Sequence, residues 1–209
     1  MKQTVTRLFD SHDEAERAIQ SLERAGVPHE DISLVGGDHH RHQESRSFAG
    51  KDGDGDGEND AAEGAGKGAA TGGLLGGGAG LLAGLGMLAI PGLGPVVAAG
   101  WLASTAAGAA AGALAGGAAG GLLGALKDSG HSDEDAQVYA EGVRRGGTLV
   151  SVRVDEGRRM EVEQLLNQSS GVDAATRGQA YRNTGWGGYD EAAPRFSRED
   201  MERERGLYR

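Results

Sequence analysis

Apolar positions alternate at first along this chain and then recur at helical spacing. Residues 4–9 alternate between polar and apolar side chains, which predicts a strand. Residues 10–14 supply an N-cap and an acidic first turn for a helix. The apolar positions that follow have helical spacing: Ala15, Ala18, Ile19, Leu22 and Ala25. Gly26 predicts the end of that helix, and residues 32–35 predict a second strand.

The same pattern returns after residue 147. Residues 148–155 predict a strand and 156–169 a helix, and a last short extended segment begins with residues 171–173. Two such strand–helix–strand units pair into one four-stranded antiparallel sheet with both helices on one face. The predicted fold class is therefore α+β and ferredoxin-like, and a further helix over 133–145 precedes the third strand.

A long apolar insertion separates the two halves. No charged residue occurs between Lys67 and Lys127, a run of 59 positions. Small residues recur every fourth position on either side of a proline-rich break, which gives a groove along one face of a helix. The glycines of this series are Gly68, Gly72, Gly76, Gly80, Gly84, Gly100, Gly108, Gly112, Gly116, Gly120 and Gly124.

The break itself predicts a tight reversal at Pro91, Gly92, Gly94 and Pro95, because proline lacks an N–H and glycine tolerates unusual dihedrals. The insertion is then a long Gly/Ala-rich antiparallel helical hairpin over 68–126. Its arms, 69–90 and 96–126, would be about 33 and 46 Å long, enough to cross a hydrocarbon core of about 30 Å.

Three interpretations of this hairpin stay open. In the first, it enters a membrane with both flanking lysines on one side and its bulky tip buried or at the far interface near Trp101. In the second, it packs against copies of itself in a soluble oligomer, because glycine and alanine are weakly apolar. In the third, it is a disordered low-complexity segment, against which the strict spacing argues.

Charge and composition narrow the partners and the compartment. The net charge of −10 disfavours nucleic acid as a partner, because an acidic surface repels phosphate backbones. The absence of cysteine excludes disulfides and thiolate chemistry. The first residues lack a continuous apolar signal region, which predicts that both flanks lie in the cytoplasm.

An acidic stretch before the insertion matches the spacing of a calcium loop. Calcium requires several hard oxygen ligands around a sharp turn, and Gly57 stands at the turn position. The candidate ligands are Asp52, Asp54, Asp56, Glu58 through its carbonyl, Asp60 and Glu63. The other interpretation is a solvated acidic linker, because no second loop exists and residues 40–51 form a poor entering helix.

Other candidate sites are weaker. His39, His40 and His42 are imidazole ligands without a defined geometry. The glycine-rich stretches lack the residues of a nucleotide loop, and no nucleophile, base and orienting group stand together. Arg144 and Arg145 have the chemistry to grip an anion, but a helix that ends near Gly146 explains them. We therefore expect no enzyme activity and no cofactor, with calcium as the possible exception.

Three segments resemble one family. They are TVTRLFDSHDEAERAIQSLERAGVPHEDISLV, DEDAQVYAEGVRRGGTLVSVRVDE and VDAATRGQAYRNTGWGGY. They look like the bacterial general stress proteins of the heat-induced, YflT-like family, and IPGLGPVVAAG is similar to the glycine-rich segment of low-temperature-induced relatives. YAEGVRRGG is the most specific part. The resemblance implies a stress-associated role without a known reaction or catalytic residues.

These observations predict five segments: the first half of the α+β domain (1–36), an acidic and histidine-rich linker (37–67), the apolar hairpin (68–126), the second half of the domain (131–178) and a charged C-terminal tail (179–209). The preferred function is a non-enzymatic stress-response protein at the cytoplasmic face of the bacterial inner membrane, with membrane lipid and further copies of itself as partners. The alternative is a soluble cytoplasmic, self-assembling stress module with a calcium-responsive acidic loop.

Overall fold

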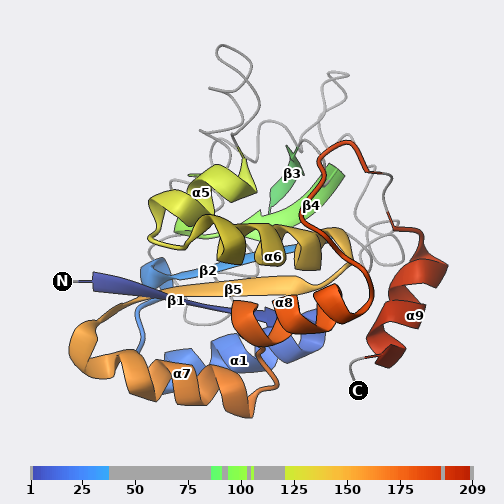
Figure 1. Ribbon diagram of the computed structural model, residues 1–209. Coiled ribbons are helices and arrows are strands. Elements are labelled where there is room, and N and C mark those ends of the chain that lie inside the picture. Colours follow the sequence, from blue (N-terminus) through green and yellow to red (C-terminus); the bar gives the residue numbers. More distant parts are fainter. Residues whose placement is uncertain are drawn as a thin grey trace, which may run out of the picture.

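An antiparallel sheet runs through the middle of the fold, with helices on both of its faces (Figure 1). The computed structural model describes residues 2–37, 86–90, 94–102, 105, 121–193 and 196–207. In this part of the chain the fold is of the α+β class, as the sequence predicts.

The strands of the sheet come from both halves of the chain and from the insertion. Their order is β1-β5-β2-β4-β3, and every neighbouring pair is antiparallel. The strands are β1 (Lys2–Phe9), β2 (Ile32–Gly37), β3 (Gly86–Ile90), β4 (Gly94–Ala99) and β5 (Thr148–Asp155). β5 lies between β1 and β2, so Val152 faces Val5 on one side and Ile32 on the other.

The extended segment predicted at 171–173 is reduced to one residue pair. Val172 exchanges two backbone hydrogen bonds with Leu8 of β1, at 2.8 and 2.9 Å. The next residue, Asp173, already caps a helix, since its carboxylate accepts from the Thr176 N–H at 2.8 Å. That helix, α8 (Ala174–Asn183), prevents a longer strand beside β1.

One face of the sheet is covered by the two helices of the strand–helix–strand units, α1 (His12–Arg24) and α7 (Arg159–Gln168) (Figure 1). Short 3-10 turns, His29–Asp31 and Glu156–Arg158, connect these helices to the sheet. Ser11 caps α1 through its hydroxyl, as the polar stretch at 10–14 predicts. The core on this face includes Val5, Phe9, Ile19, Leu22, Val150, Val152, Val162 and Leu166.

The opposite face carries α5 (Leu122–Asp128), α6 (Asp133–Arg144) and α8 (Figure 1). The expectation of helices on one face is therefore incomplete, because it placed only the helices of the two repeated units. The side chains of β1 and β5 alternate between the faces, and Leu8 and Leu149 are buried on this second face together with the hydroxyls of Thr6 and Ser151, so this face needs a cover too. The core on this second face includes Leu8, Leu102, Leu122, Leu126, Val138, Tyr139, Val143, Leu149 and Tyr181.

The middle of the insertion differs from the predicted helical hairpin. Residues 86–90 and 94–99 form the antiparallel strands β3 and β4 rather than helices. Pro95 cannot donate a helical hydrogen bond, and the β-branched pair that follows it favours an extended chain. β4 pairs with β2, which thereby gains a second neighbour. The remainder of the predicted hairpin, apart from α5 and residues 100–102 and 105, lies outside the described residues and stays a prediction.

Buried polar contacts hold the end of β4 on the domain. The Ser33 hydroxyl of β2 donates to the Ala99 carbonyl at 2.7 Å and accepts from the Leu102 N–H at 3.1 Å. Gly100, between them, has a positive φ of 83°, and a Cβ there would collide with the backbone of Ile32 and Ser33. Only glycine therefore allows the chain to approach β2 this closely.

Trp101 also packs on the domain. Its indole N–H donates to the Asp31 carbonyl at 3.3 Å, and the guanidinium of Arg153 stacks on its ring at 4.9 Å. The Asp31 carboxylate pairs with Arg153 at 3.3 Å and with Lys2 at 2.6 Å. These contacts contradict the expectation of Trp101 at a far membrane interface, because the sheet brings the predicted tip of the hairpin back to β2 and β5.

Candidate functional site

A buried carboxylate organises the C-terminal end of α6. The Glu141 side chain is 0% exposed. It accepts hydrogen bonds from Arg144 at 2.8 and 2.7 Å and from Arg145 at 2.7 Å. The three side chains meet because positions three and four residues apart lie on one helix face. A buried charge is tolerated when such partners compensate it, so this triad is a built feature of the fold.

Arg145 extends the triad to α8 and to α9 (Arg198–Leu207). Its Nη1 lies 2.9 Å from a carboxylate oxygen of Glu204, and its guanidinium lies over the rings of Tyr181 at 4.2 Å and Phe196 at 5.1 Å. Burial tends to lower the pKa of Arg145, but the hydrogen bonds that it donates to Glu141 and Glu204, together with their negative charges, outweigh burial and raise the pKa. Arg145 therefore stays cationic at every physiological pH.

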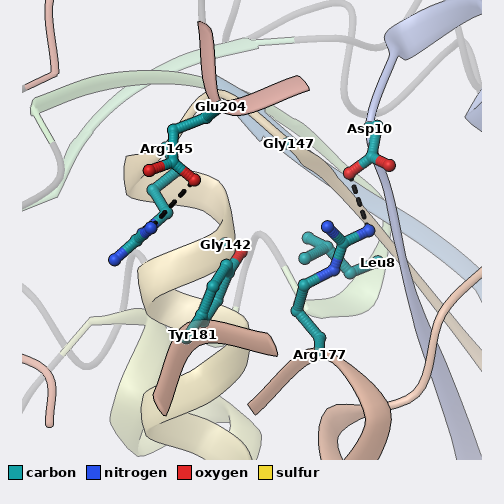
Figure 2. Close-up of a pocket in the computed structure, with 8 residues that line it drawn as sticks. All are labelled: Leu8, Asp10, Gly142, Arg145, Gly147, Arg177, Tyr181 and Glu204. Carbon is teal, nitrogen blue, oxygen red and sulfur yellow. Dashed lines mark hydrogen bonds and ion pairs between the residues drawn. The ribbon is translucent and has the colours of Figure 1, made fainter. Parts of the chain in front are cut away.

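A second buried arginine faces Arg145 across a small cavity (Figure 2). Arg177 of α8 is 3% exposed and pairs with Asp10, just after β1, at 2.7 Å. The Tyr181 ring lies between the two arginines, and Leu8, Gly142 and Gly147 complete the lining. The cavity volume is about 10 Å³, which is room for about one water molecule.

Glycine is required where α6 meets β1 beside this cavity. A Cβ on Gly142 would collide with the Leu8 side chain, and one on Gly147 would lie 2.9 Å from the Gly142 carbonyl oxygen. α6 and β1 therefore approach each other closely at these glycines. The arginines supply the polar surface of the cavity beside them. We name Arg144, Arg145, Arg177, Tyr181 and their carboxylate partners the arginine cluster.

A larger cavity lies along the outer edge of β1. Its volume is about 320 Å³. His131 Nε2 lies 2.8 Å from the Thr6 hydroxyl, which also lies 2.9 Å from the hydroxyl of Ser151. Tyr139 donates to the Thr6 carbonyl at 2.9 Å and accepts from the Ala174 N–H at 3.1 Å. Other residues that line it are Thr4, Arg7, Asp135, Arg159, Glu163 and Asp173.

The electrostatics of this second cavity follow from burial. Burial lowers the pKa of His131, and this effect exceeds that of the Asp135 charge, which raises the pKa. The imidazole is therefore neutral at pH 7. Burial also raises the pKa of Tyr139 well above its ordinary value. The His131–Thr6 pair has the groups of a base and a hydroxyl nucleophile, but Thr6 is only 2% exposed. The arrangement therefore fixes β1 against α6 and presents a neutral imidazole to the cavity.

The structure describes only part of the sites predicted from the sequence. Of the glycine series, Gly124 lies in α5, while Gly100 lies in the bend after β4 rather than on a helix. Gly94 and Pro95 begin β4, whereas Pro91 and Gly92 lie outside the described residues. The remaining glycines of the series are outside them as well: Gly68, Gly72, Gly76, Gly80, Gly84, Gly108, Gly112, Gly116 and Gly120.

The proposed calcium ligands also fall outside the described ranges; they are Asp52, Asp54, Asp56, Glu58, Asp60 and Glu63. In the part of the chain that the structure does describe, no group of three or more His, Asp or Glu side chains is placed to hold a metal ion. Across those same residues, no helix has both the length and the apolar character needed to cross a bilayer.

Two members of the arginine cluster were not anticipated from the sequence. Arg177 lies near the end of the predicted second half of the domain (131–178), where no helix was predicted, and Glu204 lies in the predicted tail (179–209). A signal for α8 was present, since Asp173 stands three residues before Thr176 in the spacing of an N-cap. No local signal identifies Glu204 as the partner of Arg145, because 59 residues separate them.

Comparisons with protein-family models, with curated proteins and with solved structures find no match to this chain.

Proposed function

We propose that the protein is a non-enzymatic bacterial stress-response protein whose α+β domain associates with the cytoplasmic face of the inner membrane through its apolar insertion. The observation that carries this proposal is the run of 59 uncharged residues between Lys67 and Lys127, which the chain inserts between β2 and β5. An uncharged apolar run of this length on an acidic chain is suited to contact lipid or another apolar surface.

The domain that carries the insertion has the plan of a ferredoxin-like unit. β5 lies between β1 and β2, α1 and α7 cover one face, and Val172 extends the sheet beyond β1 by one residue pair. This connectivity supports the proposed fold. β4 and β3 then continue the sheet beyond β2.

The contacts of β4 restrict where lipid can bind. Residues 86–90 and 94–102 belong to the folded domain. They are held there by the pairing of β4 with β2 and by the contacts of Ser33 and Trp101. The lipid-binding parts in this proposal are therefore the apolar stretches 68–85 and 106–120, one on either side of the docked strands.

Fractionation of cells tests the proposal. In one variant, residues 68–85 and 106–120 are replaced by Gly/Ser/Asn sequences of equal length, which leaves β3, β4 and α5 in place. We expect the natural chain in carbonate-washed membranes and this polar-replacement variant in the cytosol. A control variant with the same treatment at residues 38–55 should stay with the membrane. The proposal is wrong if the natural chain is cytosolic.

A second candidate is favoured by the position of β3. β3 is the last strand at its side of the sheet described here, and an edge strand is a template for pairing with another chain. A cytosolic natural chain that is oligomeric by light scattering, with a size that changes when calcium is added, would support the self-assembling module. A calcium-independent monomer would exclude it.

A further inference from the structure

α9 closes the cavity of the arginine cluster with a carboxylate from its own chain. Figure 2 shows the Glu204 carboxylate directed at Arg145, with the Tyr181 ring below it and the Arg177–Asp10 pair on the other side. The Glu204 side chain is 18% exposed, so solvent reaches this contact from outside. The cavity thus holds a carboxylate at the position where a bound anion would contact Arg145.

Few contacts hold α9 in this position. Among the side chains of α9 that the structure describes, Met201 is the buried one, at 5% exposure. Phe196, just before the helix, adds stacking with Arg144 at 5.0 Å. A ten-residue helix rich in charge is marginal by itself in water, so α9 depends on these few contacts. We expect the sheet and the other helices to keep their positions when α9 leaves.

Docked α9 adds one carboxylate to those that contact the arginine cluster. Three guanidiniums, from Arg144, Arg145 and Arg177, then face three carboxylates, from Asp10, Glu141 and Glu204. When α9 leaves, Arg145 loses its contact with Glu204 and keeps its contact with Glu141. A guanidinium binds phosphate oxygens through two parallel hydrogen bonds, and it remains charged at all relevant pH values.

We infer that the arginine cluster is a binding site for a phosphate group, and that Glu204 of α9 occupies it as an internal substitute. Phosphate enters when α9 leaves, and it then takes the place of the Glu204 carboxylate on Arg145. Tyr181 and Leu8 give the site a wall without a competing charge. The site does not depend on the proposed association with membranes.

Calorimetric titration of the full chain with inorganic phosphate tests the inference. Glu204→Gln removes the internal carboxylate, and we expect about tenfold tighter binding of phosphate than in the natural chain, because one charge-assisted competitor is lost. Glu202→Gln is the matched control, since Glu202 is exposed on the same helix, and it should bind as the natural chain does. Equal affinities of the two variants would overturn the inference.

Two further variants separate binding from a structural effect. Arg145→Gln combined with Glu204→Gln must abolish the gain in affinity. Met201→Ser loosens α9 without a change of charge, and it must produce a gain in the same direction as Glu204→Gln. A gain that persists without Arg145, or the absence of any gain in Met201→Ser, contradicts the proposed site.

Vesicles identify the source of the phosphate group. Tighter binding of Glu204→Gln to phosphatidylglycerol vesicles, as well as to inorganic phosphate, assigns the site to a lipid headgroup. A gain with inorganic phosphate alone assigns it to a soluble phosphate compound. The polar-replacement variant must keep its phosphate affinity even when it leaves the membrane, so failure of the site and failure of the membrane proposal give different results.

Discussion

Glu141 illustrates how single residues of this fold carry buried charge. Its carboxylate is closed off from solvent and lies between Arg144 and Arg145, which are 9% and 10% exposed. The sequence YAEGVRR predicts that these side chains share a helix face, because their spacing is three and four residues. The stacking of Arg145 on Phe196 and Tyr181 could not be predicted, since these two residues come from distant segments.

Replacement of Glu141 tests the importance of this pairing. Glu141→Gln leaves two nearly buried guanidiniums without their shared carboxylate, and we expect the free energy of unfolding to fall by about 3 kcal/mol. Urea denaturation measures it. The control is Glu134→Gln, which removes an exposed partner of Arg182 and should cost no more than about 0.5 kcal/mol. Equal effects would mean that the Glu141 triad adds no stability.

His131 gives the fold a defined pH dependence. Burial lowers its pKa in the folded state below the ordinary value of about 6.5. The unfolded chain therefore binds a proton more readily, so the stability is fully present above about pH 6.5 and is lost as the pH falls through the folded pKa.

Replacement of His131 tests that dependence. Between pH 7.5 and 5.5 we expect the natural chain to lose more stability than His131→Gln, as measured by urea denaturation at each pH. The comparison at pH 8, where the imidazole is neutral in both states, gives the cost of the substitution itself. Parallel curves for the two proteins would show that His131 titrates alike in the folded and unfolded chains.

At the scale of elements, helices and strands of the two repeated units could be predicted because each has a local pattern. α1 has its N-cap and apolar spacing, and β5 has its β-branched alternation. β4 could not be predicted in the same way. Glycine and alanine at regular intervals also fit a helix with a groove along one face, so this pattern does not distinguish a strand from a helix. The strand is favoured by pairing with β2, a contact between residues 59 to 65 positions apart.

Gly100 distinguishes the two conformations of this segment. In the observed fold, Gly100→Ala forces a Cβ into the backbone of β2 at a positive φ, and we expect a loss of about 2 kcal/mol or more in the free energy of unfolding. In a helix, the same change would stabilise by about 1 kcal/mol. Gly130→Ala is the control, because its φ is also positive but no atom lies within 4 Å of the added Cβ. A larger loss at Gly100 than at Gly130 confirms the docked strand.

At the scale of the whole molecule, the C-terminal helix is an addition to a complete domain. Both faces of the sheet are covered by α1, α7, α5, α6 and α8, and α9 contributes Met201 as its buried side chain (Figure 1). We expect a chain that ends at Ala193 to unfold in one cooperative transition, with a loss of about 2 kcal/mol, the value of one buried methionine.

Thermal and urea denaturation, followed by circular dichroism, measure this loss. A chain that ends at Leu207 serves as the control, because it keeps α9 whole. Failure of the 193-residue chain to fold would mean that α9 is part of the domain, and Glu204 would then be unable to leave the arginine cluster at low cost.

The order of the strands also sets the time at which the domain can close during synthesis. β1 and β2 flank β5, so neither has its central neighbour until β5 emerges from the ribosome. The 110 residues from 38 to 147 come between β2 and β5. At a synthesis rate of about 5–20 residues per second, roughly 5 to 20 seconds pass between the synthesis of β2 and the synthesis of β5. A nascent chain can therefore reach a membrane, or a chaperone, before its own domain exists.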